Sequence, residues 1–215
     1  MVIPRRILLV DDHFVARGGV QAILESAGHT IVAAASNGLE ALDKLSQHRI
    51  DLIVADLAMP KMNGHELIRI VTKKFPRAKM IVLSSHDDDK SVAAALQDGA
   101  KGYILKAGLA EELMQAVESV SLGGRFLGRP MALNGFAFYE NIDLETDGLD
   151  QLTARERQVI QLVAEGRTSD EIGLILDISR RTVEKHRNNV MGKMGFGNVS
   201  ELIRFALKNR LISDE

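Results

Sequence analysis

Apolar residues follow two different patterns, and the change between them falls near residue 150. In the first 120 residues, five short apolar runs alternate with longer stretches whose apolar residues recur at helical spacing. The runs are Ile7–Val10, Thr30–Ala35, Leu52–Ala55, Met80–Ser84 and Gly102–Leu105. Near-continuous apolar strands are required by a parallel sheet that is covered on both faces. The pattern therefore predicts a doubly wound α/β domain with a five-stranded parallel sheet.

After residue 150 the strand pattern gives way to four short helices. Three of them begin with a capping signature, in which an N-cap side chain stands three residues before a glutamate. These pairs are Thr153 with Glu156, Thr168 with Glu171, and Asn198 with Glu201. The remaining helix follows Ser179 and has Val183, Val190 and Met194 on its inward face. The pattern predicts a small four-helix, all-α domain over residues 150–215.

Glycine, proline and acidic residues interrupt both patterns between the two domains. The first domain is therefore expected over residues 1–122, and a linker over residues 123–149. Five acids stand in Glu140–Asp150 and an aromatic cluster in Phe136–Tyr139, so part of the linker is expected to pack on a domain. An acidic segment held in near contact could mask a basic surface and restrain the last domain.

Composition excludes several classes of protein. The 215 residues are 46% hydrophobic and 26% charged, which is typical of a folded chain and not of a disordered one. The absence of cysteine excludes disulfides, thiolate metal sites and cysteine nucleophiles. No apolar run approaches the ~20 residues of a membrane span, and the N-terminus lacks a signal-peptide pattern. A cytoplasmic protein without membrane contact is expected.

Charge is spread unevenly along a chain whose net charge is −2. Residues 178–210 contain eight Lys or Arg and only two acids, and a local charge of +6 requires an explanation. The helix after Ser179 begins beside Arg180 and Arg181, and its exposed face carries Lys185 and Asn188, which can pair with guanine and adenine. These features indicate the major-groove helix of a helix-turn-helix. The alternative is an amphipathic helix whose charges only solvate it.

Polar side chains follow four of the five predicted strands. They are Asp11 and Asp12 after the first strand, Asp56 after the third, Ser84 and Ser85 after the fourth, and Lys106 after the fifth. Because the carboxyl ends of parallel strands meet at one edge, these groups are expected to converge. Carboxylates that lie so near to one another repel unless a cation compensates their negative charge. A site with only oxygen ligands suits Mg²⁺. A carboxylate beside Mg²⁺, a lysine and a hydroxyl has the parts for phosphoryl transfer.

Simpler interpretations exist for single residues of this set. A lone aspartate at a strand end is usually a turn former or a helix N-cap. His13 and His86 stand near the same edge, but Mg²⁺ prefers oxygen, so both are interpreted as surface residues. The three aspartates at residues 87–89 are interpreted as a cap of the following helix. The complete set of strand-end residues is what favours a site.

The segments that carry this set resemble the receiver domain of bacterial two-component response regulators. They read ILLVDDH, DLIVADLAMPKMNGHEL, IVLSSHDDD and GAKGYILK. The resemblance implies that Asp56 accepts a phosphoryl group. It also implies that Mg²⁺ is bound by Asp11, Asp12, the Asp56 carboxylate and the backbone carbonyl of Ala58.

The same resemblance assigns three further roles. Lys106 is expected to pair with the phosphoryl group, Ser84 to hydrogen-bond it, and Tyr103 to change rotamer together with Ser84. Serine replaces the commoner threonine at position 84, which keeps the hydroxyl. Ala107 and Gly108 stand where many receivers have proline after the lysine.

The C-terminal block resembles the LuxR-type helix-turn-helix, and the order of the two domains matches the NarL/FixJ response regulators. It reads LTARERQVIQLVAEGRTSDEIGLILDISRRTVEKHRNNVMGKM. The resemblance implies that Glu184, Lys185 and Asn188 face bases. It makes phosphate-contact candidates of Arg180, Arg181, Thr182, Arg187 and Lys193. In that family the last helix also pairs two DNA-binding domains.

The resemblance implies a transcription regulator that a sensor histidine kinase phosphorylates on Asp56, which switches dimerisation and promoter binding. It is not a dedicated enzyme, although slow autodephosphorylation is expected. Its expected partners are promoter DNA, the kinase, a second copy of the chain and RNA polymerase. Two alternatives stay open. One is an aspartyl-phosphate phosphohydrolase, for which the first domain has no room for a cap domain. The other is a constitutively dimeric regulator that ignores phosphate.

Overall fold

The computed structural model describes residues 4–144 and 148–212. The chain divides into two compact units: the first comprises Met1–Met59 and Asn63–Leu144, and the second contains Glu145–Glu215. Among the described residues, no helix has the length and apolar character needed to cross a membrane.

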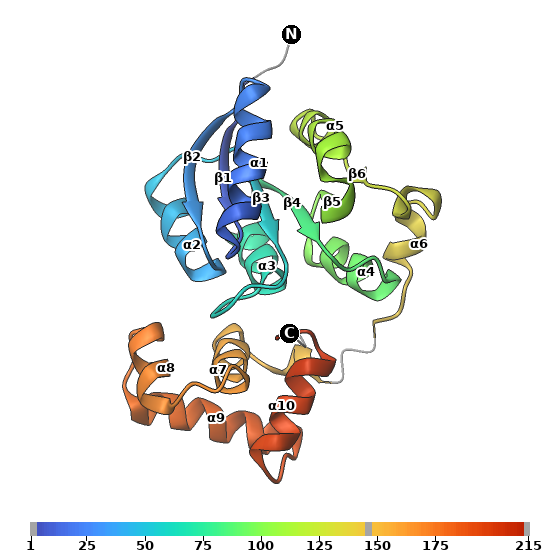
Figure 1. Cartoon of the computed structure of the whole chain (residues 1–215). Coiled ribbons are helices and arrows are strands. Elements are labelled where there is room, and N and C mark those ends of the chain that lie inside the picture. The colour runs from blue at the N-terminus through green and yellow to red at the C-terminus, as the bar shows by residue number, and fades with distance from the viewer. Residues whose placement is uncertain (1–3, 145–147, 213–215) are drawn as a thin grey trace. The chain divides into compact units, whose positions relative to one another are not determined.

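The first unit is a doubly wound α/β fold around a parallel sheet with strand order β2-β1-β3-β4-β5-β6 (Figure 1). Its strands are β1 (Arg6–Val10), β2 (Thr30–Ala35), β3 (Leu52–Asp56), β4 (Lys79–Ser84), β5 (Gly102–Leu105) and β6 (Phe126–Leu127). Its helices are α1 (Phe14–Ser26), α2 (Gly38–Gln47), α3 (Gly64–Lys74), α4 (Asp89–Asp98), α5 (Leu109–Ser121) and α6 (Phe136–Glu140). The five predicted strands are confirmed to within one residue at each end.

Both faces of the sheet are buried, as the apolar runs require. Along β1, Ile7 and Leu9 belong to a core that includes residues of α1 and α5. Leu8 and Val10 belong to a second core, which includes residues of α2, α3 and α4. This alternation places two helices on one face and three on the other. It leaves the carboxyl ends of the strands free to carry the polar residues.

The sheet has one strand more than the five that the sequence predicts. β6 pairs with β5 in parallel, and the short helix α6 packs on α4. Residues 123–144 of the expected linker are therefore part of the first unit, so this part is packed on a domain as expected. A strand of two residues beside glycines gives no periodic signal, which is why the pattern missed it. The remainder of that segment includes residues 145–147, which lie outside the described residues.

The second unit is all-α. Its four main helices are α7 (Ala154–Ala164), α8 (Ser169–Leu176), α9 (Arg180–Met194) and α10 (Val199–Lys208). The predicted starts are confirmed: Thr153 and Thr168 form complete capping boxes, and Asn198 accepts from the backbone of Glu201. Apolar residues of α7, α9 and α10 share one core, which includes Ile160 and Val190.

A tight turn joins α8 to α9. Asp177 adopts the left-handed conformation at φ 53°, and Ser179 accepts the backbone N–H of Thr182 as the N-cap of α9. The chain passes so close to Gly173 that a Cβ there would lie 2.8 Å from the carbonyl oxygen of Ile178. A glycine is therefore needed for the two helices to approach in this way.

Candidate functional site

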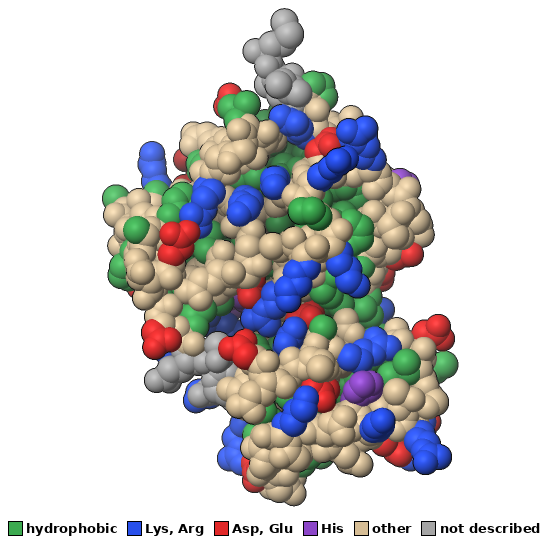
Figure 2. Space-filling view, turned by 180° about the vertical axis from the view of Figure 1, so that it is seen from behind, with side chains coloured by type: hydrophobic (Ala, Val, Ile, Leu, Met, Phe, Trp, Pro, Cys, Tyr) green, Lys and Arg blue, Asp and Glu red, His purple; other side chains and the backbone are tan. Residues whose placement is uncertain are grey.

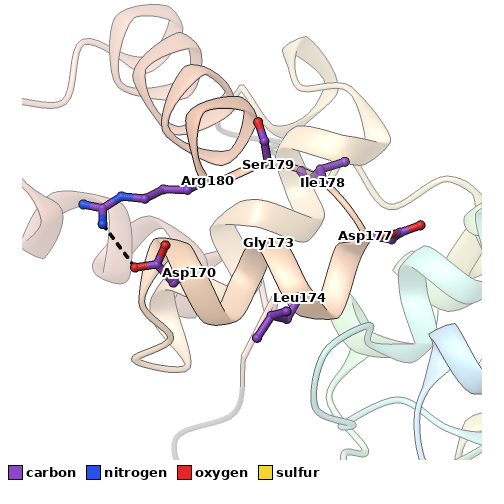
Figure 3. Close-up of a pocket in the computed structure, with 7 residues that line it drawn as sticks. All are labelled: Asp170, Gly173, Leu174, Asp177, Ile178, Ser179 and Arg180. Carbon is purple, nitrogen blue, oxygen red and sulfur yellow. Dashed lines mark hydrogen bonds and ion pairs between the residues drawn. The ribbon is translucent and has the colours of Figure 1, made fainter.

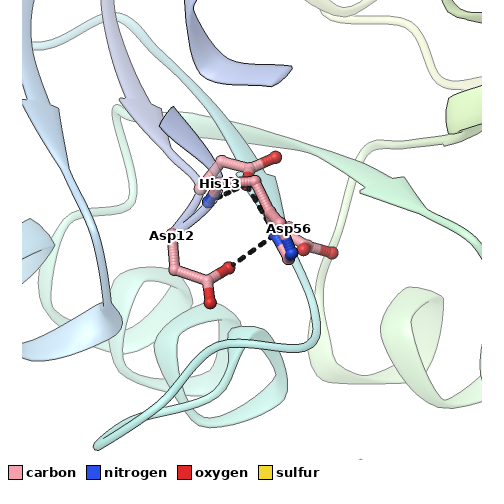
Figure 4. Close-up of side chains that lie close together, drawn as sticks. Asp12, His13 and Asp56 are labelled. Atoms are coloured by element: carbon pink, nitrogen blue, oxygen red, sulfur yellow. Dashed lines mark hydrogen bonds and ion pairs between the residues drawn. The ribbon is translucent and has the colours of Figure 1, made fainter. Parts of the chain in front are cut away.

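The carboxyl ends of β1 and β3 bring three aspartates together. Ligand atoms of Asp11, Asp12, Asp56 and His13 all lie within 4.8 Å of one another. Figure 4 shows the side chains of Asp12, His13 and Asp56 close together. Asp11 and Asp56 are 4% exposed, whereas Asp12 and His13 are exposed. Two carboxylates are thus anchored inside the fold, and one faces the solvent above them.

Lys106 lies between the two buried carboxylates. Its Nζ is 2.8 Å from Oδ2 of Asp56 and 3.1 Å from Oδ2 of Asp11. Burial raises the pKa of Asp56 above its ordinary value, and the charge of Asp11 adds to this, whereas Lys106 opposes it. Burial acts to lower the pKa of Lys106, but its bonds to both aspartates outweigh this and raise it. The site therefore holds a fixed ammonium beside a carboxylate whose charge is costly to bury.

The backbone around Asp56 fixes one of its carboxylate oxygens. Oδ1 accepts the N–H of Leu57 at 2.7 Å, which leaves Oδ2 to Lys106. The loop after β3 returns close to the strand at Gly64, where a Cβ would lie 2.5 Å from the backbone oxygen of Asp56. The glycine of the DLIVADLAMPKMNG segment is thus required by this close approach. Ala58, whose carbonyl is an expected metal ligand, is half-buried in the same loop.

His13 and Arg17 also belong to this edge. The His13 backbone N–H donates to Oδ1 of Asp11 at 2.8 Å, and its ring Nδ1 is 3.1 Å from Oδ1 of Asp12. The Arg17 guanidinium on α1 donates to the backbone carbonyl of Asp11. Sequence reasoning interpreted His13 as a surface residue and did not consider Arg17. A basic residue in the first turn of the helix that follows the strand-end aspartates was the available signal.

Ser84 and Tyr103 both bind the backbone of His86. Ser84 Oγ accepts the N–H of His86 at 3.0 Å, and the Tyr103 hydroxyl donates to the His86 carbonyl at 2.7 Å. Both side chains are buried, and both come from the β4–β5 part of the sheet. The loop between β4 and α4 is therefore held by the two residues expected to act as a pair. Its Asp88 caps α4 by accepting from Ser91, as the run of aspartates predicted.

The donor set fits a hard divalent cation. Its carboxylates supply oxygen ligands from a buried and a solvent-facing position, which Mg²⁺ prefers because it keeps several waters. Asp11 and Asp12 hold their carboxylates beside Asp56, and Lys106 already compensates part of the negative charge.

The expected DNA-binding residues are spread over α9 of the second unit. Figure 2 shows one face of the molecule, with many Lys and Arg side chains at its surface. Arg181, Lys185 and Asn188 are exposed, and Thr182, Glu184 and Arg187 are half-buried. The buried residues Val183 and Val190 lie on the opposite side of the helix, as predicted. The exposed side chains are therefore available to a partner.

Arg180 and Lys193 have partners within the second unit. Arg180 donates to Glu184 at 2.8 Å and to Asp170 of α8 at 3.1 Å, beside an open hollow at the turn (Figure 3). Lys193 lies near the C-terminal end of α9, and its Nζ is 2.7 Å from Oε2 of the buried Glu156. Burial acts to raise the pKa of Glu156, but Lys193 and Thr153 outweigh it and hold that pKa below its ordinary value.

Two family models match the chain. Residues 7–118 match the response regulator receiver domain, and residues 150–206 match the bacterial regulatory proteins of the luxR family. The transcriptional regulatory protein MctR of Rhizobium johnstonii is 34% identical over 97% of this chain and 95% of its own length. The oxygen regulatory protein NreC of Staphylococcus aureus is 33% identical over 96% of this chain and 99% of its own.

A solved structure is similar over nearly the whole chain. The response regulator ChrA, of a heme-sensing two-component system, is 30% identical, with a TM-score of 0.52. The match covers 98% of this chain and all of that one.

Proposed function

The chain belongs to the response regulators that join a receiver domain to a LuxR-type DNA-binding domain, and we propose that phosphorylation of Asp56 controls it. The protein is a transcriptional response regulator, like the relatives it matches along nearly their whole length. The observation that carries the proposal is the Asp56 carboxylate, which is buried beside Asp11 yet held by Lys106.

The chemistry we propose is transfer of a phosphoryl group from a phosphohistidine of a sensor kinase. An Asp56 oxygen attacks phosphorus and a P–O bond forms while the P–N bond breaks, so the imidazole leaves and the product is an acyl phosphate. Lys106 stays within reach of the new charge, and Ser84 supplies a hydroxyl one strand away. Water later cleaves the acyl phosphate, which makes the chain an acceptor with slow self-hydrolysis and not a dedicated enzyme.

We propose that Mg²⁺ is the cofactor and that Asp11, Asp12, Asp56 and the Ala58 carbonyl hold it. Bound there, the ion would neutralise charge on the transferred oxygens. Asp11 is fixed for this purpose, because the His13 N–H binds one of its carboxylate oxygens and Lys106 the other. His13 itself contacts the carboxylates from outside and is proposed to orient Asp12, not to bind the ion.

For DNA, we propose that Lys185 and Asn188 read bases and that Arg181 contacts phosphate, because all three are exposed on α9. Thr182 and Arg187 are proposed as further phosphate contacts. Arg180 and Glu184 are proposed to act together, since their ion pair orients both side chains before DNA arrives. Lys193 is proposed to brace α7 against α9 instead of binding phosphate. A second copy of the chain is the expected partner on DNA.

The test is phosphorylation of the intact chain by a small acyl phosphate donor with Mg²⁺. We expect one label per chain, released by hydroxylamine as an acyl phosphate, and none in Asp56→Asn. Asp51→Asn is the matched control, because Asp51 binds Arg6 just before β3 and is expected to leave labelling unchanged. Label that persists in Asp56→Asn, or that resists hydroxylamine, would refute the assignment.

A further inference from the structure

Helix α1 begins directly after the aspartates of the site, and it carries a cation where its neighbours carry acids. The helices α2, α3, α4 and α5 each have an acidic residue in the first turn, whereas α1 has none. The fourth residue of α1 is Arg17. Positive charge near a helix N-terminus is unfavourable, because the helix dipole is itself positive there. Arg17 therefore weakens the start of α1, and its placement needs a cause outside the helix.

The Arg17 side chain turns back from α1 toward the end of β1. Helical side chains lean toward the N-terminus, and the Arg17 guanidinium donates to the backbone carbonyl of Asp11. That carbonyl belongs to the peptide that joins Asp11 to Asp12, so the guanidinium lies beside the pair of aspartates. Its central carbon also lies over the Phe14 ring, 5.7 Å from the ring centroid. The ring covers one side of the guanidinium and helps to hold it at this place.

The fold does not neutralise the charge of Arg17. Within residues 4–144 and 148–212, no acidic side chain forms an ion pair with Arg17, whose guanidinium binds a neutral carbonyl instead. Lys106 differs, because its ammonium is bound to the carboxylates of Asp11 and Asp56. Arg17 is half-buried, so its charge is less screened by water than that of an exposed side chain. The edge of the sheet thus holds two cations, of which one is unpaired.

The charges at the site indicate what the second cation balances. Three carboxylates and the Lys106 ammonium leave a charge of −2, with the imidazole counted as neutral, and a bound Mg²⁺ would cancel it. Phosphorylation replaces the Asp56 carboxylate, of charge −1, by a group of charge about −2. One negative charge is then in excess. The guanidinium of Arg17 supplies the positive charge that balances it.

From these observations we propose that Arg17 stabilises the phosphoryl group on Asp56 through space; the proposal rests on the proposed function of Asp56. The guanidinium is already in place before the reaction, so no rearrangement is needed when the negative charge develops. The same charge repels a cation at the site. Arg17 therefore favours the phosphorylated state and disfavours Mg²⁺ when no phosphoryl group is present.

A charge and a structural brace make opposite predictions for the loss of Arg17. If Arg17 acts by its charge, its removal weakens binding of an anionic phosphoryl analogue and tightens binding of Mg²⁺ alone. If Arg17 only holds the peptide between Asp11 and Asp12, its removal releases the proposed metal ligands. Binding of both the analogue and the metal then becomes weaker.

The test is calorimetry on the intact chain with two ligands: Mg²⁺ alone, and beryllofluoride at saturating Mg²⁺. For Arg17→Gln we expect beryllofluoride to bind about fivefold more weakly, which is the size of a Coulomb interaction between unit charges several ångströms apart beneath a partly hydrated surface. We expect Mg²⁺ alone to bind at least about twofold more tightly, because a like charge is gone. Arg17→Lys keeps the charge and is expected to bind both ligands within about twofold of wild type.

Arg77→Gln is the matched control. Arg77 is exposed and precedes β4, whose six residues separate it by about 20 Å from the carboxyl ends of the strands. This distance exceeds the screening length of ~8 Å at physiological salt. Arg77→Gln is therefore expected to bind both ligands as the wild-type chain does, and an effect as large as that of Arg17→Gln would overturn the proposal.

The remaining outcomes separate this proposal from the proposed function. Unchanged beryllofluoride binding in Arg17→Gln overturns the role of Arg17, and so does Mg²⁺ binding that is unchanged or weaker. A loss in Arg17→Lys as large as in Arg17→Gln overturns it too. Loss of folding in Arg17→Gln, checked by urea unfolding, would assign Arg17 a structural role. Failure of the wild-type chain to bind beryllofluoride with Mg²⁺ would overturn the proposed function of Asp56 itself.

Discussion

The two units each bury a carboxylate against a lysine, and the two pairs behave in opposite ways. Asp56 lies 2.8 Å from Lys106, and Glu156 lies 2.7 Å from Lys193. The pKa of Asp56 is raised by burial and by Asp11, whereas that of Glu156 is lowered by Lys193 and by the Thr153 cap once these outweigh burial. An equal distance to a lysine therefore does not define the role of a carboxylate. The other neighbours of the carboxylate decide whether its buried charge is stabilised or remains unfavourable.

The difference separates reactivity from structure. In the first unit, the carboxylates are crowded at strand ends, where we propose that they bind a cation and that Asp56 accepts a phosphoryl group. In the second unit, Glu156 completes a capping box and joins α7 to α9. The groups that stabilise the charge of Glu156 outweigh its burial, whereas those around Asp56 do not.

The largest effect is expected from replacing the two lysines with methionine. Lys106→Met removes the charge that faces the transferred phosphoryl group, so the rate of Asp56 labelling is expected to fall by roughly 100-fold, as for loss of one transition-state donor. Lys193→Met is the matched control and is expected to label at the wild-type rate while its second unit unfolds more easily. Labelling rates with a small acyl phosphate measure both. Equal labelling rates in the two variants would mean that Lys106 has no special role in phosphorylation of Asp56.

The next effect concerns the exposed residues of α9 that are proposed to contact DNA. Lys185→Ala and Asn188→Ala are each expected to lose ~1–3 kcal/mol of discrimination at particular base pairs. Arg181→Ala is expected to weaken binding to all sequences and to reduce the salt slope by roughly one. Affinities for DNA selected by the wild-type chain, measured at several salt concentrations, separate the two behaviours. A uniform loss in all three variants would show that α9 reads no bases.

A smaller effect is expected on the stability of the second unit. Glu156→Gln keeps the shape of the side chain but removes the charge that Lys193 and Thr153 hold, which is expected to cost about 1–2 kcal/mol of unfolding free energy. Asp56→Asn is expected to stabilise the first unit, because it removes a charge that burial disfavours. Urea unfolding of each variant gives the comparison. Destabilisation of the first unit by Asp56→Asn would contradict the expectation that the charge of Asp56 is costly to bury.

The smallest effect is the pH dependence of these stabilities. The folded-state pKa of Glu156 lies below its unfolded value of 4.5, so its contribution is fully present above pH 4.5 and is lost as pH falls through the folded pKa. Asp56 has the opposite sign: its pKa is raised above 3.8, so it disfavours folding as pH rises through that window. Glu156→Gln should flatten the acid limb of the second unit's stability curve, and Asp56→Asn should raise the first unit's stability near neutral pH. If the stability of Glu156→Gln fell with acid as steeply as that of the wild-type chain, Glu156 would not be the group responsible for this pH dependence.

Sequence patterns predicted most of the fold, because the signals were strong and local. The five apolar strands and the capping pairs at Thr153 and Thr168 each follow from neighbours in the chain. The convergence of Asp11, Asp56 and Lys106 followed from the topology of a parallel sheet. Two contacts leave no periodic pattern in the sequence and were not predicted. The strand β6 is only two residues long. Lys193 is one of eight basic residues in residues 178–210, and only the fold shows that it pairs with Glu156.

We propose that Asp56 in the first unit controls DNA binding by the second. The direct measurement is the affinity of the intact chain for selected DNA at fixed salt, with Mg²⁺, before and after labelling by an acyl phosphate, on wild type and Asp56→Asn. The labelled wild-type chain is expected to bind about tenfold more tightly than the unlabelled chain, a typical coupling between two sites, with Asp56→Asn unchanged by the donor. Equal affinity of labelled and unlabelled wild-type chain would contradict the claim and favour a regulator that ignores phosphate.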